Sequence, residues 1–431
     1  MKKNLLCMLA ILLLGTMHVD AATGIIAPNA DGQLICYVLT GNGQQLMVVS
    51  RTAAGFSDEE KYSGDIVIPE SVTTNEGETL SVVGIASEAF RSCTALTSVT
   101  IPGSVTYIGM QAFFGCSALT SVTIPEGVTT IDYNLFYGCT ALTSVSIPNS
   151  VTEIGEGAFY KCAKLTSINF PDGLKTIGYH TFFKCTGLTS ITIPDGLTSI
   201  GEMAFFGCAG LTSICIPNSV THLGKQAFSN CTGLTSATIG NGLTDISFAA
   251  FYQCTELTSL TLGSGLTSIG NAAFALCSGL TTVTIPDNVT DIVAAAFFSC
   301  PSLTTVTIGK SVKTIGKGAF GDCMSLADVY CLAEAVPATD DEDPFAESSV
   351  ATATLHVPTA SVDAYKSTAP WSSFKEVVAI TAQDVGISGI AGDVHPATVR
   401  YTLGGRRTNH SEKGLTIFRT PDGSVRKAVV K

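Results

Sequence analysis

A cysteine recurs every 23 residues through the middle of this chain. Eleven such cysteines run from Cys93 to Cys323, and each follows a phenylalanine by three positions, from Phe90 to Phe320. A leucine keeps the same period, so ten complete units fill residues 96–325 without an insertion. A short, regular period of this kind indicates one small structural unit stacked on copies of itself. We therefore expect a solenoid, whose properties are set by repeated surfaces and not by one central cleft.

The unit at residues 96–118 reads LTSVTIPGSVTYIGMQAFFGCSA, and the other units keep its apolar positions with small changes. Val99 and Ile101 alternate with polar residues, which is the pattern of a short strand with one buried face. Pro102 then removes a backbone donor, and Gly103 accommodates a turn. The strand is therefore predicted to end at this point in every unit.

A second inward-facing segment follows that turn. Val105 and Ile108 predict another extended piece, and Ala112, Phe113 and Cys116 lie at the spacing of one tight helical turn. Each rung should therefore hold one short strand, a second extended segment and a helical turn. A single rung cannot bury these side chains, so its neighbours must complete the core and both ends need caps. With strands about 4.8 Å apart, ten regular rungs extend roughly 50 Å.

This unit resembles the repeat of the BspA-like leucine-rich repeat proteins, whose pattern is L-x-x-I-x-I-P-x-x-V-x-x-I-G-x-x-A-F-x-x-C. The resemblance covers residues 60–330. Its first unit is stretched by a loop at residues 75–78, and its last unit has Tyr330 and Cys331 in place of the strand Thr and Ile. The resemblance implies a leucine-rich repeat solenoid in a secreted or surface-attached protein of the Bacteroidetes type, with a role in adhesion.

The N-terminus has the composition of an export signal. Lys2 and Lys3 precede an apolar run at residues 5–14, and small residues follow, so residues 1–22 are predicted to be a signal peptide. Cys7 lies inside the run and no Leu-x-Gly-Cys motif is present, which argues against a lipid anchor. Beyond this segment no apolar run reaches the ~18 residues that span a bilayer. We expect an extracellular or outer-surface protein, with the periplasm as the alternative.

Residues 23–59 are predicted to form the N-terminal cap. Two strand-like runs, at residues 34–39 and 45–49, flank the glycines at residues 41–43. This arrangement is typical of a β-hairpin.

Residues 331–380 are predicted to form the C-terminal cap. They include a strand-like stretch and a short helix for which Thr359 is the expected N-cap. The only tryptophan of the chain, Trp371, follows this helix. Together with Phe345 and Phe374, it is expected to cover the open apolar end of the last rung.

The C-terminal part of the chain differs in charge from the acidic remainder. After a linker at residues 381–395, the tail at residues 396–431 has eight Arg or Lys against two acidic residues, and its glycine-separated runs predict short strands. The tail resembles the C-terminal sorting domain of secreted Bacteroidetes proteins in its G-R-x, K-G-x and terminal K-x-x-V-x patterns, with Thr402 and Thr416 where that family prefers Asp and Tyr. A basic tail otherwise suggests nucleic-acid binding, but aromatic stacking platforms are missing and no nucleic-acid partner is predicted.

The repeated cysteines raise the question of disulfides, because exported proteins usually oxidise their thiols. Neighbouring repeat cysteines should have Cα atoms about 4.8 Å apart, but parallel side chains fit the disulfide dihedral poorly. We therefore expect a stack of buried, reduced thiols, with disulfides between rungs as the alternative. Cys215 differs because it occupies an outward strand position, and it is expected to be the most reactive thiol.

The sequence contains no convincing motif for a metal, a cofactor or catalysis. Cys-x-x-Cys and Cys-with-His spacings are missing, and the acidic loop at residues 340–343 lacks the Asp-x-Asp-x-Asp-Gly pattern, which favours a solvated loop over a calcium site. His180 and His222 fall at variable positions of the repeat. A G-x-G-x-x-G match at residues 316–321 follows no βαβ pattern. We predict no cofactor and no enzymatic activity.

The first candidate binding surface is a column of outward residues on the strands, mostly threonines that repeat every 23 residues. A simpler explanation is that threonine suits exposed strands without any ligand. Asn169 and Cys215 interrupt the column. The candidate binding residues are Thr100, Thr123, Thr192, Thr238, Thr261, Thr284 and Thr307.

The second candidate surface is an aromatic column, one residue after each repeated phenylalanine. It should be partly exposed, and packing between rungs is the favoured role. Its members are Phe114, Tyr137, Tyr160, Phe183, Phe206, Tyr252 and Phe298.

The sequence therefore predicts a non-enzymatic, monomeric recognition scaffold. The implied partner is a host or bacterial surface protein or glycan, as the resemblance to BspA-like proteins suggests. The alternative is a structural or surface-coating solenoid without a specific ligand. A binder of ice-like or crystalline surfaces is a further alternative, suggested by the Ser-x-Thr array.

Overall fold

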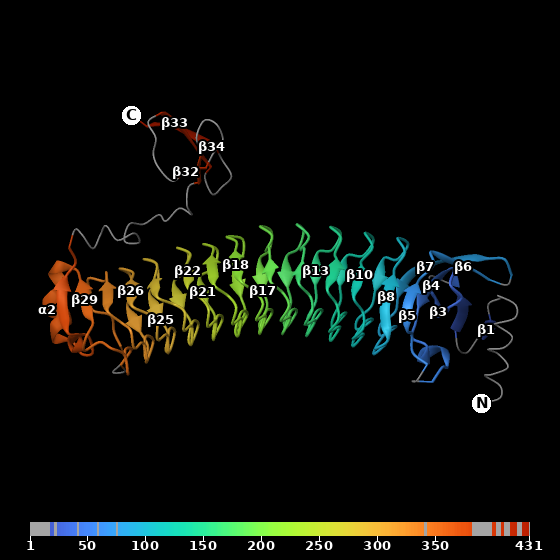
Figure 1. The fold of residues 1–431 in the computed structure, drawn as a ribbon, viewed down its shortest axis with the longest axis horizontal. Coiled ribbons are helices and arrows are strands. Elements are labelled where there is room, and N and C mark those ends of the chain that lie inside the picture. The colour runs from blue at the N-terminus through green and yellow to red at the C-terminus, as the bar shows by residue number, and fades with distance from the viewer. Residues whose placement is uncertain are drawn as a thin grey trace. The chain divides into compact units, whose positions relative to one another are not determined.

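The computed structural model describes most of the solenoid and its caps, and the chain divides into two units, Met1–Val378 and Ala379–Lys431. The first unit is a gently curved stack of coils that lie side by side along one axis (Figure 1). The expected signal peptide at residues 1–22 lies outside the described residues except for positions 18–20. The described residues are 18–20, 24–40, 43–57, 60–74, 76–339, 343–381, 399–401, 407–408, 414–419 and 425–430.

An antiparallel sheet covers the N-terminal end of the solenoid. β2 (Gly24–Pro28), β3 (Leu34–Thr40) and β4 (Gln45–Val48) pair in this order, which confirms the expected hairpin. β4 then pairs in parallel with β7 (Thr79–Ile85), so the cap leads directly into the stacked coils. The other elements of this end are β1 (His18–Asp20), the 3₁₀ turn η2 (Thr52–Ala54) and β6 (Ser71–Thr73).

From residue 96 onward, paired first strands of neighbouring rungs are parallel and in register, because equivalent residues lie 23 apart, whereas the strand at Gly64–Val67 joins the next one with a register shift. Ser121 pairs with Ser144, and Thr238 pairs with Thr261. These strands are β5 (Gly64–Val67), β8 (Leu96–Thr100), β10 (Ser121–Thr123), β12 (Ser144–Ser146), β14 (Ser167–Ile168), β16 (Ser190–Ile191), β18 (Ser213–Ile216), β20 (Ser236–Ile239), β22 (Ser259–Thr261), β24 (Thr282–Thr284), β26 (Thr305–Ile308) and β28 (Asp328–Cys331).

The second extended segment of each rung is a two-residue strand that ends on a buried Ile or Leu. These strands also pair in parallel, as Ile154 does with Ile177. They are β9 (Tyr107–Ile108), β11 (Thr130–Ile131), β13 (Glu153–Ile154), β15 (Thr176–Ile177), β17 (Ser199–Ile200), β19 (His222–Leu223), β21 (Asp245–Ile246), β23 (Ser268–Ile269), β25 (Asp291–Ile292) and β27 (Thr314–Ile315).

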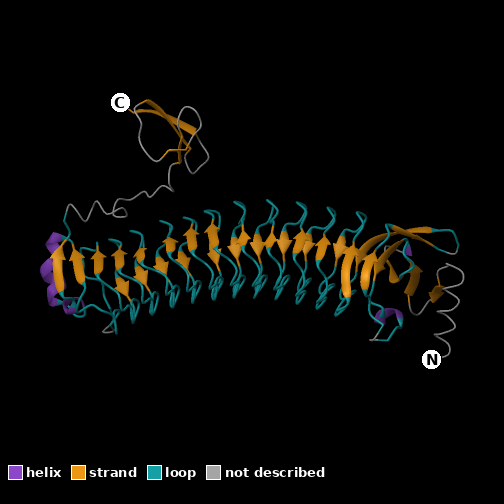
Figure 2. Cartoon of the chain, viewed as in Figure 1, coloured by secondary structure: helices purple, strands orange, loops and turns teal. Residues whose placement is uncertain are grey.

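The third segment is a run of successive turns, where the sequence predicted a helical turn. Its amides alternate: Ala112 N–H donates to Gly109 within the rung, whereas Phe113 N–H donates to Leu135 O of the next rung. Two positions per rung have φ near +55°, as at Gln111 (+57°), so a regular helix cannot continue. Among the residues that the structure describes, helices therefore occur only at the two ends of the solenoid (Figure 2).

Stacked phenylalanines fill the centre of the coils. Phe205 lies 5.1 Å from both Phe182 and Phe228 between ring centroids, with the rings parallel within 6°. The repeated cysteines and leucines are buried beside them, as predicted. Each rung thus covers the apolar side chains of the next, which no isolated rung does.

The C-terminal cap extends the solenoid beyond the point where the sequence repeat decays. β28 pairs in parallel with β26 and with β29 (Thr354–Val357), and β30 (Glu376–Ala379) follows in the same sheet. Backbone pairing needs no repeated sequence, so the sheet continues although the repeat does not.

Aromatic side chains close the apolar core at this end, as predicted. Phe345 stacks on Phe320 at 5.7 Å, and Trp371 and Phe374 contact Phe345 edge-on at 5.5 and 5.2 Å. The prediction that Thr359 is a helix N-cap is wrong. The α-helix α2 (Val362–Ser367) begins later, after the 3₁₀ turn η3 (Thr359–Ser361), and no side chain caps it. A second 3₁₀ turn, η4, spans Trp371–Ser373.

The second unit contains an antiparallel sheet in the order β32-β31-β33-β34. The short strands predicted for the basic tail are thus present, whereas Thr402 and the linker at residues 382–395 lie outside the described residues. Within the described parts of the chain, no helix is long and apolar enough to cross a membrane. The strands are β31 (Val399–Tyr401), β32 (Arg407–Thr408), β33 (Gly414–Arg419) and β34 (Val425–Val430).

Candidate functional site

The strand face consists of the outward positions 97, 98 and 100 and their equivalents up to residue 307. Thr123 is exposed between the buried Val122 and Ile124, which is the alternation that the sequence predicts. The other candidate threonines are exposed as well, except Thr307, which is half-buried. Their predicted exposure is confirmed, and their role in binding stays a prediction.

Hydrogen bonding divides the threonines of the strand face into two kinds. At the equivalents of position 97 from Thr120 to Thr258, the hydroxyl donates to the backbone of the preceding rung: Thr235 Oγ1 lies 2.9 Å from Thr212 O, and Thr258 Oγ1 lies 3.2 Å from Thr235 O. At position 100, hydroxyls such as those of Thr238 and Thr261 have no hydrogen-bond partner among the described residues. One column is therefore used by the fold, and the other is free for a ligand.

Side-chain amides border the middle of the strand face. Asn218 Oδ1 accepts the Asn241 N–H at 2.7 Å, and Asn241 Oδ1 accepts the Ser264 N–H at 2.8 Å. Asn288 Nδ2 then donates to Ser264 O at 2.7 Å. These hydrogen bonds connect the loops that follow the strands in neighbouring rungs. They therefore hold the edge of the strand face in place.

The turn face consists of the outward side chains of residues 107–115 and their equivalents, and it contains the aromatic column. Five of the predicted rings form a continuous stack from Phe114 to Phe206, with centroids 4.3 to 4.9 Å apart and planes within 6°. The stack stops at Ser229, which is buried. Because neighbouring rings cover each other's faces, the expected packing role is confirmed for these five.

Cations that the sequence did not single out lie beside this stack. Lys161 Nζ is 5.3 Å from the Tyr160 ring centroid, and Lys184 Nζ is 5.6 Å from that of Phe183. Both lysines have φ near +57°, and the equivalent position in several neighbouring rungs is glycine. Only the geometry reveals these contacts, because the interacting residues occupy ordinary variable positions.

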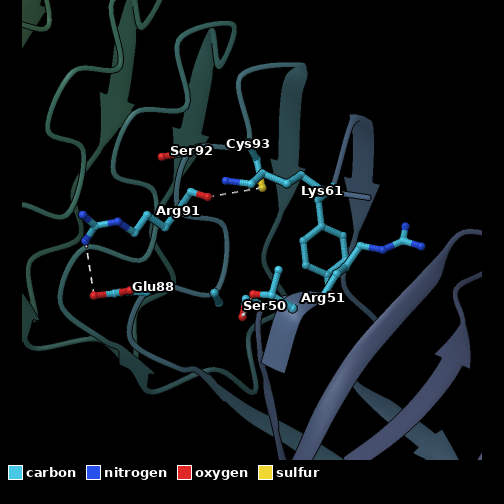
Figure 3. Close-up of a pocket in the computed structure, with 10 residues that line it drawn as sticks. Ser50, Arg51, Lys61, Glu88, Arg91, Ser92 and Cys93 are labelled. Atoms are coloured by element: carbon cyan, nitrogen blue, oxygen red, sulfur yellow. Dashed lines mark hydrogen bonds and ion pairs between the residues drawn. The ribbon is translucent and has the colours of Figure 1, made fainter. Parts of the chain in front are cut away.

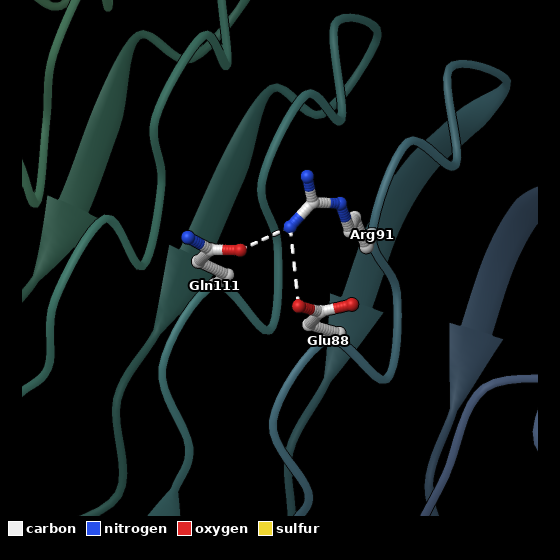
Figure 4. Close-up of polar contacts among 3 residues, drawn as sticks. All are labelled: Glu88, Arg91 and Gln111. Atoms are coloured by element: carbon white, nitrogen blue, oxygen red, sulfur yellow. Dashed lines mark hydrogen bonds and ion pairs between the residues drawn. The ribbon is translucent and has the colours of Figure 1, made fainter.

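Arg91 closes the N-terminal end of the aromatic stack. Its guanidinium lies 4.6 Å from the Phe114 ring centroid, and it donates to Glu88 Oε1 at 3.2 Å and to Gln111 Oε1 (Figure 4). The charge is thus paired and its ring contact is fixed. Arg91 serves as a cap of the stack.

A pocket of about 240 Å³ lies where the N-terminal cap meets the first rung. It is lined by three cations, Arg51, Lys61 and Arg91, and by Glu88 and Cys93, among others (Figure 3). In Figure 3, however, Arg51 and Arg91 extend in opposite directions, and Arg91 is engaged by Glu88. The cations do not converge, so the pocket offers no common point at which to hold an anion.

The sequence matches the family described as BspA type leucine rich repeat region, in six copies, over residues 83–212 and 198–327. These ranges cover more than half of the 431 residues. The chain belongs to this BspA-type family. No curated protein matches it.

Among solved structures, three of those similar to this BspA-type chain are of bacterial origin. A leucine rich cell surface protein of Faecalibacterium prausnitzii is 26% identical, with 73% of this chain and 94% of that one covered and a TM-score of 0.42. A leucine-rich repeat protein of Bacteroides ovatus is 27% identical, with 69% and 92% covered and a TM-score of 0.40. The pneumococcal vaccine antigen PcpA is 15% identical, with 85% and 99% covered and a TM-score of 0.49.

His180 and His222 of this BspA-type solenoid lie at separate surface positions within the described residues. His180 Nε2 lies 3.0 Å from Met203 Sδ on the turn face, and burial lowers the pKa of His180, against the opposite effect of Glu156 and Glu202. His222 lies on β19, exposed. Across the described residues, no group of three or more His, Cys, Asp or Glu side chains is placed to hold a metal.

The G-x-G-x-x-G match at residues 316–321 of this BspA-type repeat follows β27 and forms successive turns. The Gly318 N–H donates to Asp343 O and the Gly316 N–H to Ile292 O, so both amides are used by neighbouring rungs. A dinucleotide site requires such a glycine loop to open a helix, and none follows here. The interpretation of this match as an accident of the repeat is consistent with the structure.

The thiols fall into the two predicted environments. Burial raises the pKa of the Cys185 and Cys231 thiols to about 12, and the repeated cysteines are all buried. Cys215 is exposed on the strand face, in register with Thr238. High pKa and burial make the repeated thiols inert, so Cys215 is the accessible nucleophile of the strand face.

Proposed function

We propose that this BspA-type protein is a non-enzymatic scaffold that recognises proteins or glycans through its strand face, as an exported or surface-attached adhesin. One observation supports this most directly. The position-100 column presents unpartnered side chains on ten consecutive rungs, from Thr100 to Thr307. Such a surface offers many weak, equivalent contacts to an extended partner instead of one constellation of reactive groups.

Two further features support the proposal. The matched family consists of repeat solenoids, and a solenoid surface is suited to binding along its length. The lysine pair and apolar run within residues 1–22 have the pattern of an export signal. Export is what an adhesin requires.

The test is a glycan and surface-protein array probed with the mature chain, followed by two matched triple variants. Replacing Thr192, Thr238 and Thr261 together by lysine should weaken an identified interaction strongly, because bulky charged side chains then fill the strand face. Replacing three aromatic residues of the turn face should have a much smaller effect. The aromatic control is the variant Y137K/Y160K/Y252K.

Three outcomes would contradict the proposal. The reverse ranking of the two variants would move the site to the turn face. Loss of binding only on deletion of residues 331–431 would exclude the solenoid as the binding part. If the wild-type chain binds nothing on the array, the protein is better explained as a structural or surface-coating solenoid.

A further inference from the structure

The charge distribution of the strand face differs from that of the whole chain. The protein has 23 basic and 35 acidic residues. None of them occupies positions 97, 98 or 100, or an equivalent position up to residue 307. A surface without charges neither attracts a charged polymer nor compensates for the desolvation of its ions. The chemistry of the strand face therefore favours an uncharged partner.

Large apolar anchors are also missing from the strand face. Between residues 96 and 323, every exposed large hydrophobic side chain lies on the turn face instead. Protein interfaces rely on buried Tyr, Trp, Met and Arg anchors at their centre, which the strand face does not provide. The side chains concerned are Tyr107, Met110, Tyr133, Tyr179, Phe248, Val293 and Phe298.

The remaining chemistry of the strand face is that of free hydroxyls. Position 100 contributes one column, and position 98 contributes a second, in which the side-chain hydroxyls of Ser121 and its equivalents to Thr305 make no hydrogen bond within the described residues. A hydroxyl both donates and accepts, as each hydroxyl of a sugar does. The two columns lie roughly 7 Å apart along the strand and repeat about every 4.8 Å along the solenoid.

From these three observations we infer that the ligand of the strand face is a neutral, hydroxyl-rich polysaccharide that lies along the solenoid. This inference rests on the proposed recognition function and narrows its ligand. Each free hydroxyl exchanges hydrogen bonds with a sugar hydroxyl, and the repeat supplies affinity by multiplying weak contacts over several rungs. Because no ions take part, binding is independent of ionic strength.

The two kinds of threonine provide a matched test. The variant T192V/T238V/T261V removes three free hydroxyls at nearly constant shape. The control T189V/T235V/T258V removes three hydroxyls of the same rungs that already donate to backbone carbonyls. Affinity electrophoresis and calorimetry use soluble mannan, dextran and mixed-linkage β-glucan as neutral probes, with heparin, polygalacturonate and gelatin as charged and protein probes. Circular dichroism confirms that both variants are folded.

The expected result is that the wild-type chain binds at least one neutral polysaccharide equally at low and high salt. The first variant should lose at least about tenfold in affinity, as expected for three lost hydrogen bonds, whereas the control should change by less than about twofold. Binding of heparin, polygalacturonate or gelatin alone, abolished by the first variant, would overturn the neutral-glycan inference and leave recognition by the strand face intact. Neutral-glycan binding that is equal in both variants, or no binding to any probe, would overturn both.

Discussion

The thiol of Cys208 donates a hydrogen bond to the carbonyl oxygen of Phe182, one rung earlier in the coil, with Sγ and O 3.1 Å apart. The same carbonyl also accepts the backbone N–H of Cys185, so the thiol is its second donor. Equivalent thiol bonds of 3.0 to 3.5 Å occur from Cys116 to Cys323. A small apolar side chain with a weak donor suits this buried position, which explains why cysteine repeats there.

Stability should fall steeply at alkaline pH because of these thiols. Burial raises the pKa of Cys185 and Cys231 from the ordinary 9.0 to about 12. Between these values the thiolate forms only in the unfolded chain, so unfolding releases protons and the free energy of unfolding falls as pH rises. It is unaffected below about pH 9, and each such thiol lowers it by about 1.4 kcal/mol per pH unit within the window.

Urea unfolding followed by circular dichroism at pH 7, 9 and 10 measures this effect. The variant C185A/C231A should show a shallower decline between pH 9 and 10 than the wild type, because two fewer thiols ionise on unfolding. A wild-type midpoint that stays constant from pH 7 to 10 would show that the repeated thiols are not buried in solution.

Cys215 should react first with an alkylating reagent under native conditions. It is exposed, whereas every repeated cysteine from Cys93 to Cys323 is buried. Iodoacetamide treatment followed by peptide mass spectrometry should find Cys215 modified and the repeated cysteines unmodified until the chain is unfolded. Early modification of the repeated positions, or disulfides between successive rungs, would contradict the predicted reduced and buried stack.

Removing one ring from the central phenylalanine stack should destabilise the solenoid strongly. Phe205 is fully buried and contacts rings on both sides, so F205A should cost about 3–5 kcal/mol in free energy of unfolding. The control T192A removes an exposed side chain and should cost little. Equal losses in the two variants would mean that the inward and outward faces have been assigned incorrectly.

The sequence predicted the features that depend on the period itself. Burial of Phe205 and exposure of Thr192 follow from their places in the repeat, because every rung needs the same contacts. The strand-like stretch predicted for the C-terminal cap is present as Thr354–Val357, but its parallel pairing with Asp328–Cys331 was not predicted, because the repeat decays there although backbone pairing does not. The left-handed conformation at Lys161 was also missed, because equivalent rungs have different residues at that position.

The hydrogen bonds of the strand-face hydroxyls also could not be predicted from the repeat. Thr235 and Thr238 are both exposed threonines of one rung, and the sequence does not show which of the two hydroxyls bonds to the preceding rung. In the folded chain, Thr235 Oγ1 donates to Thr212 O, whereas the Thr238 hydroxyl has no partner among the described residues. The direction of a side chain relative to the preceding rung is a three-dimensional property that a one-dimensional period does not contain.

The aromatic column provides a last test, which separates stacking from simple burial of a ring. Tyr160 lies between Tyr137 and Phe183, with ring centroids 4.3 and 4.6 Å away, whereas Tyr252 makes no ring contact within the described residues. Each stacked pair contributes about 0.5–1.5 kcal/mol beyond burial, so Y160A should destabilise the chain by about 1–3 kcal/mol more than Y252A. Denaturant unfolding of both variants measures the difference. If the two variants are equally stable, stacking does not contribute to the free energy of unfolding. The aromatic residues from Phe114 to Phe206 then act as independent, partly exposed side chains.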